Sequence, residues 1–177
     1  MRDQKLLASL LGGALLLLAA CQSDEAGMAS GSYTTPPAPA DALFEPLNVK
    51  ARGIDFENTL TYTAQFTPYT YRNYFNGGGV GLGDFNNDGW VDIYFTGNLA
   101  DNRLYLNQGD LTFKDITDQA GVACPDVWSS GVAVADVNGD GWLDIYVCKS
   151  GAPDGQNRHN ELFINQKDLT FKEQAAE

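Results

Sequence analysis

The sequence is poor in basic residues and has almost no histidine. It contains 11 lysines and arginines against 23 aspartates and glutamates, and His159 is its single histidine. Proteins that bind nucleic acid carry a basic face, so the net charge of −12 argues against that class of partner. No zinc site of cysteine and histidine, nucleophile elbow, phosphate-cradling loop or catalytic triad can be found. We therefore expect a protein that is not an enzyme, with His159 as a solvated loop residue.

Only one long apolar run is present, and it lies at the N-terminus. Residues 6–20 are apolar, follow basic residues and end in L-A-A-C at Cys21. The run is too short to span a membrane as a helix. Small residues directly before a cysteine resemble a bacterial lipobox, so residues 1–20 are predicted to be a lipoprotein signal peptide and Cys21 the lipidated residue. This predicts an outer-membrane lipoprotein of a bacterial cell envelope, exposed at the surface; an ordinary secretory signal is the alternative.

The next two segments differ in composition. Residues 21–43 are mostly serine, glycine, threonine, alanine and proline, which predicts a flexible tether with little to bury. Residues 44–78 carry many large apolar side chains, and the alternation of polar and apolar residues over 60–66 predicts a strand. We expect this N-terminal β segment to pack against the structure that follows it.

Two nine-residue stretches, 84–92 and 136–144, share the pattern D-x-N-x-D-G-W-x-D. Side-chain oxygens at positions 1, 3, 5 and 9 and a backbone carbonyl at position 7 suit Ca²⁺, which binds about six to eight oxygens. The glycine at position 6 allows the chain to turn sharply. The predicted calcium ligands are Asp84, Asn86, Asp88, Trp90 and Asp92 in the first loop and Asp136, Asn138, Asp140, Trp142 and Asp144 in the second.

Other interpretations of these loops fit less well. An EF-hand needs a glutamate at position 12 and a helix on each side, but Phe95 and Val147 occupy that position and the flanking residues are typical of strands. Mg²⁺ demands near-octahedral geometry, and metal-free turns remain an alternative. Trp90 and Trp142 occupy the same position in both loops, which favours packing over a sugar-stacking role.

Each loop belongs to a longer repeat. Residues 79–95 match residues 131–147, and residues 102–115 match residues 160–173. Four short strands in roughly 50 residues are the pattern of a propeller blade. We therefore predict an all-β fold with two four-stranded blades, one at residues 79–130 and one at residues 131–177 that is truncated at its end.

The repeats read G-V-x-x-x-D-x-N-x-D-G-x-x-D-I-Y, followed by N-x-L-Y-L-N and L-x-F. They resemble the FG-GAP/VCBS repeats of integrin-α-like β-propellers, and residues 74–80 are similar to bacterial envelope proteins of the ASPIC/UnbV-associated type. The resemblance implies calcium in both loops and a role in adhesion or in binding a glycan or protein. A non-catalytic propeller portion of a polysaccharide-degrading enzyme, or an accessory lipoprotein of an outer-membrane uptake system, are the alternatives.

Two further expectations concern completeness and cysteines. Propellers close with about four to eight blades, so two blades predict the N-terminal piece of a larger propeller, with a ring of several copies as the alternative. Cys148 stands where the other repeat has Thr96, so Cys148 and Cys124 are expected to be unpaired and mostly buried. An oxidising envelope would also permit a bond between them.

Overall fold

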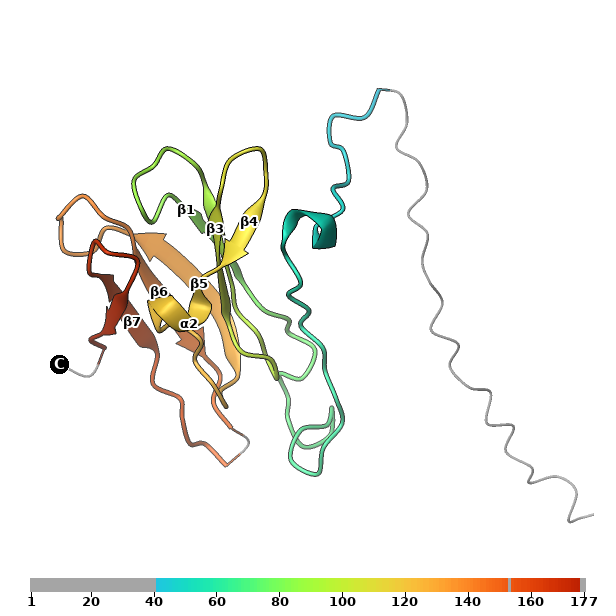
Figure 1. The fold of residues 1–177 in the computed structure, drawn as a ribbon. Coiled ribbons are helices and arrows are strands. Elements are labelled where there is room, and N and C mark those ends of the chain that lie inside the picture. Colours follow the sequence, from blue (N-terminus) through green and yellow to red (C-terminus); the bar gives the residue numbers. More distant parts are fainter. Residues whose placement is uncertain (1–40, 153, 176–177) are drawn as a thin grey trace, which may run out of the picture. The chain divides into compact units, whose positions relative to one another are not determined.

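The computed structural model describes residues 41–152 and 154–175, and residues from Leu47 onward form one compact unit (Figure 1). The predicted signal peptide, Cys21 and nearly all of the tether lie outside the described residues. No helix in the described part of the chain has the length and apolar character needed to cross a membrane.

Two four-stranded antiparallel sheets make up the compact unit, and each follows the order of its strands in the sequence. The first sheet contains β1 (Val80–Gly83), β2 (Asp92–Phe95), β3 (Arg103–Asn107) and β4 (Phe113–Asp115). The second contains β5 (Ser129–Ala135), β6 (Asp144–Lys149), β7 (Glu161–Asn165) and β8 (Phe171–Glu173). The all-β prediction with two four-stranded blades is confirmed, and the two sheets do not close into a ring.

The sheets lie face to face, with β1 against β5 (Figure 1). We call the face of the first sheet that carries Gly81, Tyr94 and Leu104 its trailing face, because it meets the sheet that follows. The corresponding inner face of the second sheet, its leading face, carries Val134 and Ile145. Each sheet also has an outer face: the leading face of the first sheet and the trailing face of the second.

Glycines on β1 let the sheets approach closely. A Cβ atom at Gly81 would lie 2.8 Å from the Val134 side chain, and one at Gly83 would lie 2.7 Å from that of Leu143. Real Cβ atoms essentially never lie this close to another heavy atom, so a side chain at either position would force its neighbour on the second sheet to move. The space between the sheets is filled by a single apolar cluster, to which the inner faces and the short helix α2 (Thr117–Ala120) contribute. Its buried members are Phe85, Tyr94, Leu104, Leu106, Ile116, Ala120, Val122, Ile145, Val147 and Phe163.

Residues 41–79 contain no strand, so the prediction of a strand over residues 60–66 is wrong. The hydrogen bonds around residues 60–70 are local: the Thr63 amide donates to the Phe66 carbonyl, and the Thr70 hydroxyl donates to the Gln65 carbonyl. Turns that satisfy their own backbone groups leave none for a neighbouring strand. Between residues 41 and 79 the only regular element is the 3₁₀-helix η1 (Lys50–Arg52).

This segment nevertheless contacts the outer face of the first sheet. The Phe56 ring stacks on Phe95 with the ring centroids 4.9 Å apart, and the Tyr105 hydroxyl donates to Asp55 Oδ1 at 2.7 Å. Burial, together with this hydrogen bond, raises the pKa of Tyr105 to about 12. The same bond lowers the pKa of Asp55.

Candidate functional site: the acidic loops and a pocket at the opposite end

Both predicted loops connect the first and second strands of their sheets, and they lie side by side at one end of the molecule (Figure 1). The Asn87 side-chain amide donates to the Gly141 carbonyl at 3.3 Å, so the loops contact each other directly. Gly89 and Gly141 have φ angles of 91° and 86°. The turn geometry expected of the glycine at position 6 is therefore present in both loops.

In the first loop, carboxylates accept hydrogen bonds from the backbone of the turn. Asp84 accepts from the amides of Asp88 and Gly89, at 3.1 and 2.8 Å. Asp88 Oδ1 accepts from the Trp90 amide at 2.8 Å, and Asp88 Oδ2 accepts from the Asn86 side chain at 2.8 Å. The first, third and fifth positions thus form one hydrogen-bonded cluster.

The second loop repeats this arrangement. Asp136 accepts from the amides of Asp140 and Gly141, at 3.0 and 2.8 Å. Asp140 Oδ1 accepts from the Trp142 amide at 3.0 Å, and Asp140 Oδ2 accepts from Asn138 at 3.3 Å. The same residues therefore produce the same local structure twice.

The aspartate at position 9 lies beneath each loop. Asp92 is fully buried, and its two carboxylate oxygens accept from the amides of Phe85 at 2.9 Å and Asn107 at 2.8 Å. Burial raises the pKa of Asp92, the two amides offset part of that effect, and the charges of Asp88 and Asp84 raise it further. Three carboxylates of one loop are thus close enough to repel one another.

Sequence reasoning gave no role to the asparagines that end β3 and β7. Asn107 and Asn165 donate their amide hydrogens to the aspartates at position 9, and their side chains donate to the carbonyls of Val91 and Leu143. Asn165 also donates to the Phe85 carbonyl at 2.8 Å, which joins the second sheet to the first loop. The signal was present in the sequence, because the same asparagine closes the third strand of both repeats.

The donor chemistry of each loop suits a hard cation. Three carboxylates and one amide oxygen come from a single turn, and a carboxylate oxygen that accepts one backbone hydrogen bond keeps a second lone pair. Within the described residues, no three Asp, Glu, His or Cys side chains are gathered closely enough to hold a metal ion as they stand. Binding would therefore require the carboxylates of a loop to turn towards one point.

The surroundings of the two loops differ. Lys167 lies beside the second loop, with its Nζ atom 3.2 Å from Asp140 Oδ2, and the counterpart of Lys167 in the first repeat is Gly109. Burial alone would raise the pKa of Asp140, but hydrogen bonds from Trp142 and Lys167 outweigh it and lower the pKa. At the first loop the Trp90 ring lies near Gly109 and is 53% exposed, so this tryptophan is not a core residue.

The other predicted site residues are solvated or structural. The His159 side chain is 67% exposed, with Nε2 3.7 Å from Glu161 Oε1. The cysteines are free, as expected, but only Cys124 is partly buried; Cys148 is exposed, and the prediction of a mostly buried thiol is wrong there. Cys148 lies on the outer face of the second sheet, opposite Gly131 in the strand pairing.

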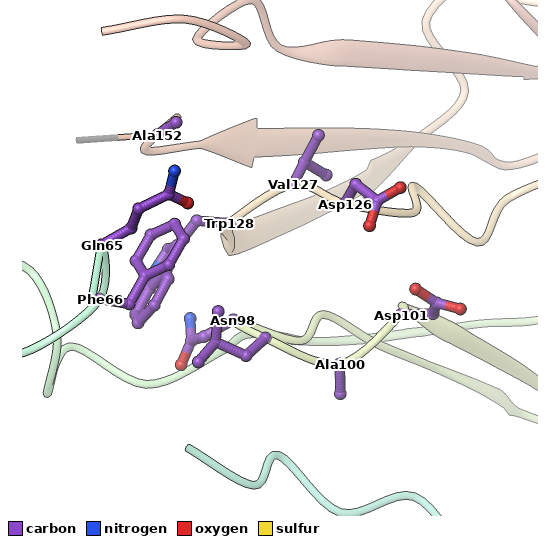
Figure 2. Close-up of a pocket in the computed structure, with 10 residues that line it drawn as sticks. Gln65, Phe66, Asn98, Ala100, Asp101, Asp126, Val127, Trp128 and Ala152 are labelled. Atoms are coloured by element: carbon purple, nitrogen blue, oxygen red, sulfur yellow. The ribbon is translucent and has the colours of Figure 1, made fainter. Parts of the chain in front are cut away.

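A pocket, drawn in Figure 2, lies at the end of the sheets opposite the acidic loops, because its residues 98–101 belong to the connection between β2 and β3. Its volume is about 310 Å³, and it is assembled from four separate segments of the chain. Phe66 stacks on Trp128 with the ring centroids 5.3 Å apart, and Trp128 also packs against Tyr71 and Tyr74. The buried Nε1 atom of Trp128 has no hydrogen-bond acceptor within the described residues. The remaining lining residues are Gln65, Asn98, Leu99, Ala100, Asp101, Asp126, Val127 and Ala152.

Comparison with known proteins agrees with this geometry. Residues 84–147 match the FG-GAP-like repeat. The matched stretch starts at the first residue of the first acidic loop and ends within β6. The first loop, strands β2 to β5 and the second loop therefore lie within the matched stretch, and β1 lies just before it.

Relatives with the same kind of similarity are found among animal proteins. Cartilage acidic protein 1 of Homo sapiens is 40% identical over 72 residues, which is 41% of this chain and 11% of the relative. The Mus musculus protein gives the same figures, and the Xenopus tropicalis protein is 39% identical over a stretch of the same length. The match thus covers about a tenth of the length of these relatives.

Proposed function

We propose that this chain supplies calcium-braced, propeller-type repeats to a binding protein anchored on the bacterial cell envelope. The observation that supports the calcium site best is the duplicated loop: the same oxygen-bearing residues form the same hydrogen-bonded turn twice, above a buried aspartate. A single acidic turn has many explanations. Two turns of identical design, in contact with each other, are best explained by the same kind of ligand, of opposite charge, bound in each.

The role proposed for calcium is structural. Asp84, Asn86, Asp88 and Asp92 would hold one ion, together with the Trp90 carbonyl, and the corresponding residues of the second loop would hold another. The ion would supply charge that cancels the repulsion among three carboxylates. Calcium sites of extracellular modules have dissociation constants of about 10⁻⁴–10⁻³ M. Such an affinity suits a brace that is filled outside the cell.

The wider role that we propose is adhesion, or the binding of a glycan or protein, by a lipoprotein of the ASPIC/UnbV-associated type held at the outer membrane through Cys21. FG-GAP repeats are propeller-type repeats that are often found in binding proteins. In this proposal the ligand contacts the sheets at the aromatic pocket with Asp101 and Asp126 at the other end. We expect no catalysis by this part of the protein, which would equally suit the non-catalytic portion of a larger enzyme or of an uptake system.

The test of the calcium proposal is thermal unfolding in about 10 mM calcium, in about 10 mM magnesium and in chelator. At the affinities above, calcium at about 10 mM should stabilise each loop by about 1.4–2.7 kcal/mol, because only the folded state binds it well. The variants Asp88→Asn and Asp140→Asn should each lose about half of the gain in melting temperature. Asp126→Asn is the matched control, because it removes one exposed carboxylate outside both loops. A folded protein whose melting temperature ignores calcium would rule the proposal out.

A further inference from the structure

The pocket of Figure 2 lies between the two repeats and not on an outer face of either sheet. Residues 98–101 come from the connection between β2 and β3, residues 126–128 from the connection that leads into β5, and Ala152 from the connection after β6. Gln65 and Phe66 of the segment before β1 complete it. Its volume of about 310 Å³ falls at the lower end of the range of small-molecule sites, about 300–1,000 Å³.

One part of the pocket wall is apolar. The Phe66 ring is partly exposed and stacks on the buried Trp128, with the ring centroids 5.3 Å apart. Leu99, Ala100 and Val127 line the pocket as well and are also only partly buried. A ligand therefore gains free energy by laying an apolar stem against this part of the wall, because both surfaces leave water.

The charged part of the wall is purely acidic. Asp101 and Asp126 are exposed, and neither carboxylate has a hydrogen-bond or ion-pair partner within the part of the chain that the structure describes. The described residues that line the pocket include no lysine, arginine or histidine. In Figure 2 the two aspartates lie away from the rings of Phe66 and Trp128. The pocket thus combines an apolar part with a separate negative part.

Side-chain hydrogen-bond donors that a ligand could reach are scarce. Both amide hydrogens of Asn98 are already donated, to the carbonyls of Gly77 and Ser129, each at 2.9 Å. The Nε1 atom of Trp128 is buried, so it is not open to a ligand in the pocket. The Gln65 side chain is exposed and can donate as well as accept. A wall that mainly accepts hydrogen bonds suits a ligand group that only donates them, as ammonium and guanidinium groups do.

The repeat itself does not require a carboxylate at this place. Asp101 precedes Asn102, and the residue that precedes the matching Asn160 is His159. The two asparagines nevertheless keep one role, since each donates to the tyrosine hydroxyl of its own sheet, at 2.8 and 2.7 Å. The carboxylate of Asp101 is therefore a feature of this pocket and not of the blade.

We propose that this pocket binds an organic cation, in which an ammonium or guanidinium group is carried on an apolar stem. The stem would lie against Phe66 and Val127, and the cationic group would donate hydrogen bonds to Asp101 and Asp126. This inference rests on the proposed binding role of the pocket and names the class of ligand. Anionic ligands, acidic glycans among them, are disfavoured because the two carboxylates repel them.

The test is a titration of the full chain, followed through its three indole N–H signals by nuclear magnetic resonance. Trp128 lies in the pocket, whereas Trp90 and Trp142 lie in the acidic loops, so the signals report separately on the two ends. Trp90→Phe and Trp142→Phe assign them. Calcium at about 10 mM keeps the probes from competing for the loops.

Four probes share one stem: butylammonium, butylguanidinium, neutral butanol and the anion butyrate. Both cations should shift the Trp128 signal and leave those of Trp90 and Trp142 in place. Butanol should bind about tenfold more weakly, because it lacks both ion pairs, and butyrate should not bind. Cation binding should weaken several-fold between about 0.05 M and about 0.5 M salt, since salt screens exposed charges.

Asp101→Asn and Asp126→Asn should each weaken cation binding by up to about fivefold, because each removes one exposed ion pair. Asparagine is the suitable replacement at position 126, where φ is 58°, since it tolerates the left-handed region. Asp118→Asn, which removes an exposed carboxylate outside the pocket, is the matched control and should bind the cations like the wild type. The affinity for butanol should be the same in all of these proteins.

Equal binding of butanol and the cations, or cation binding that survives the loss of both carboxylates, would overturn the proposal. Shifts caused by glucosamine and N-acetylglucosamine alike, but by neither butyl cation, would overturn it in favour of a sugar site and leave the proposed binding role standing. No shift of Trp128 with any probe would remove the pocket as a binding site altogether. The response of Trp90 and Trp142 to calcium tests the proposed brace independently.

A free amine and a lysine or arginine side chain of a protein present the same cationic group. Blocked tripeptides with a central lysine or arginine separate these two sources. Tighter binding than that of the butyl cations would support the proposal with a protein side chain as the ligand. Weaker binding would support it with a small amine.

Discussion

Tyr94 and Tyr146 occupy the same position in the two sheets, and each accepts a hydrogen bond from an asparagine just before the third strand. Tyr94 is buried beneath the second sheet and bonds to the Val122 carbonyl, while Tyr146 is 37% exposed. The two tyrosines differ in what lies against them, not in their own sheets. A blade of this type therefore completes its core only when a neighbour follows it.

The acidic loops, unlike the two tyrosines, are alike in both repeats. Each is built by hydrogen bonds within its own repeat, so the two have the same internal structure although their neighbours differ. Local chemistry sets the loops, and packing between repeats sets the faces. The two repeats should therefore respond alike to substitutions in the loops and differently to changes at the faces.

The largest effect is expected from the buried aspartates. Asp92→Ala or Asp144→Ala would leave two backbone amides without an acceptor beneath a loop. We expect each change to lower the free energy of unfolding by about 3 kcal/mol, measured by urea denaturation. Asp101→Ala, at an exposed position that lines the pocket, should cost less than about 0.5 kcal/mol. A large loss for one aspartate and none for the other would show that the two repeats do not share this network.

The reactivity of the two cysteines should distinguish the space between the sheets, where Cys124 lies, from the outer face of the second sheet, where Cys148 lies. Cys124 packs against the cluster between the sheets, and burial, followed by the charge of Glu161, raises its pKa to about 11. At pH 8 only about one Cys124 in a thousand would be a thiolate, compared with about one in four for an ordinary thiol. Iodoacetamide should therefore alkylate Cys124 at least about a hundred times more slowly than the exposed Cys148.

The rate at Cys124 should rise about tenfold for each pH unit until it levels off near pH 11, because the thiolate is the reactive form. Mass spectrometry of the digested protein follows each cysteine separately, which also keeps Cys21 out of the comparison. In urea the two rates should become similar. Rapid alkylation of Cys124 in the folded protein at pH 8 would contradict its placement between the sheets.

The parts of the fold that could be predicted from the sequence are those that a short stretch of chain determines. The loop pattern predicted the turn at Gly89 and Gly141, and the matched runs predicted four strands per repeat, because turn residues and alternation act over a few neighbours. Residues 60–66 show the same alternation but form no strand, since nothing in their own pattern reveals the absence of a partner to pair with.

Contacts between distant residues could not be predicted in this way. The bond from Asn165 to the Phe85 carbonyl joins residues 80 positions apart, and the pocket draws on four segments. The short helices η1 and α2 both end at a glycine with positive φ, Gly53 and Gly121, but this match is hidden because the two stretches share a shape and few letters. Of these contacts, only the one made by the asparagine at the end of the third strand left a sign in the sequence, because Asn107 and Asn165 occupy the same position in both repeats.

The smallest effect should come from the one cation that separates the two loops. Lys167 lies 3.2 Å from Asp140 and is about half exposed, so the pair is worth at most about 1 kcal/mol. Calcium bound at the second loop would have to compete with this ammonium group. Lys167→Gly introduces the residue of the first repeat at a position where both repeats have positive φ, 70° at Lys167 and 87° at Gly109.

We expect Lys167→Gly to tighten calcium binding at the second loop by up to about fivefold, the factor that corresponds to about 1 kcal/mol. Calorimetric titration in an Asp88→Asn background, where the first loop is weakened, isolates this site. Lys167→Gln removes the charge without the backbone change and should give most of the gain, while Lys167→Arg should give none. An affinity that follows the backbone change and not the charge would mean that the ammonium group does not compete with the ion. The difference between the loops would then lie in the strain of a lysine held at positive φ.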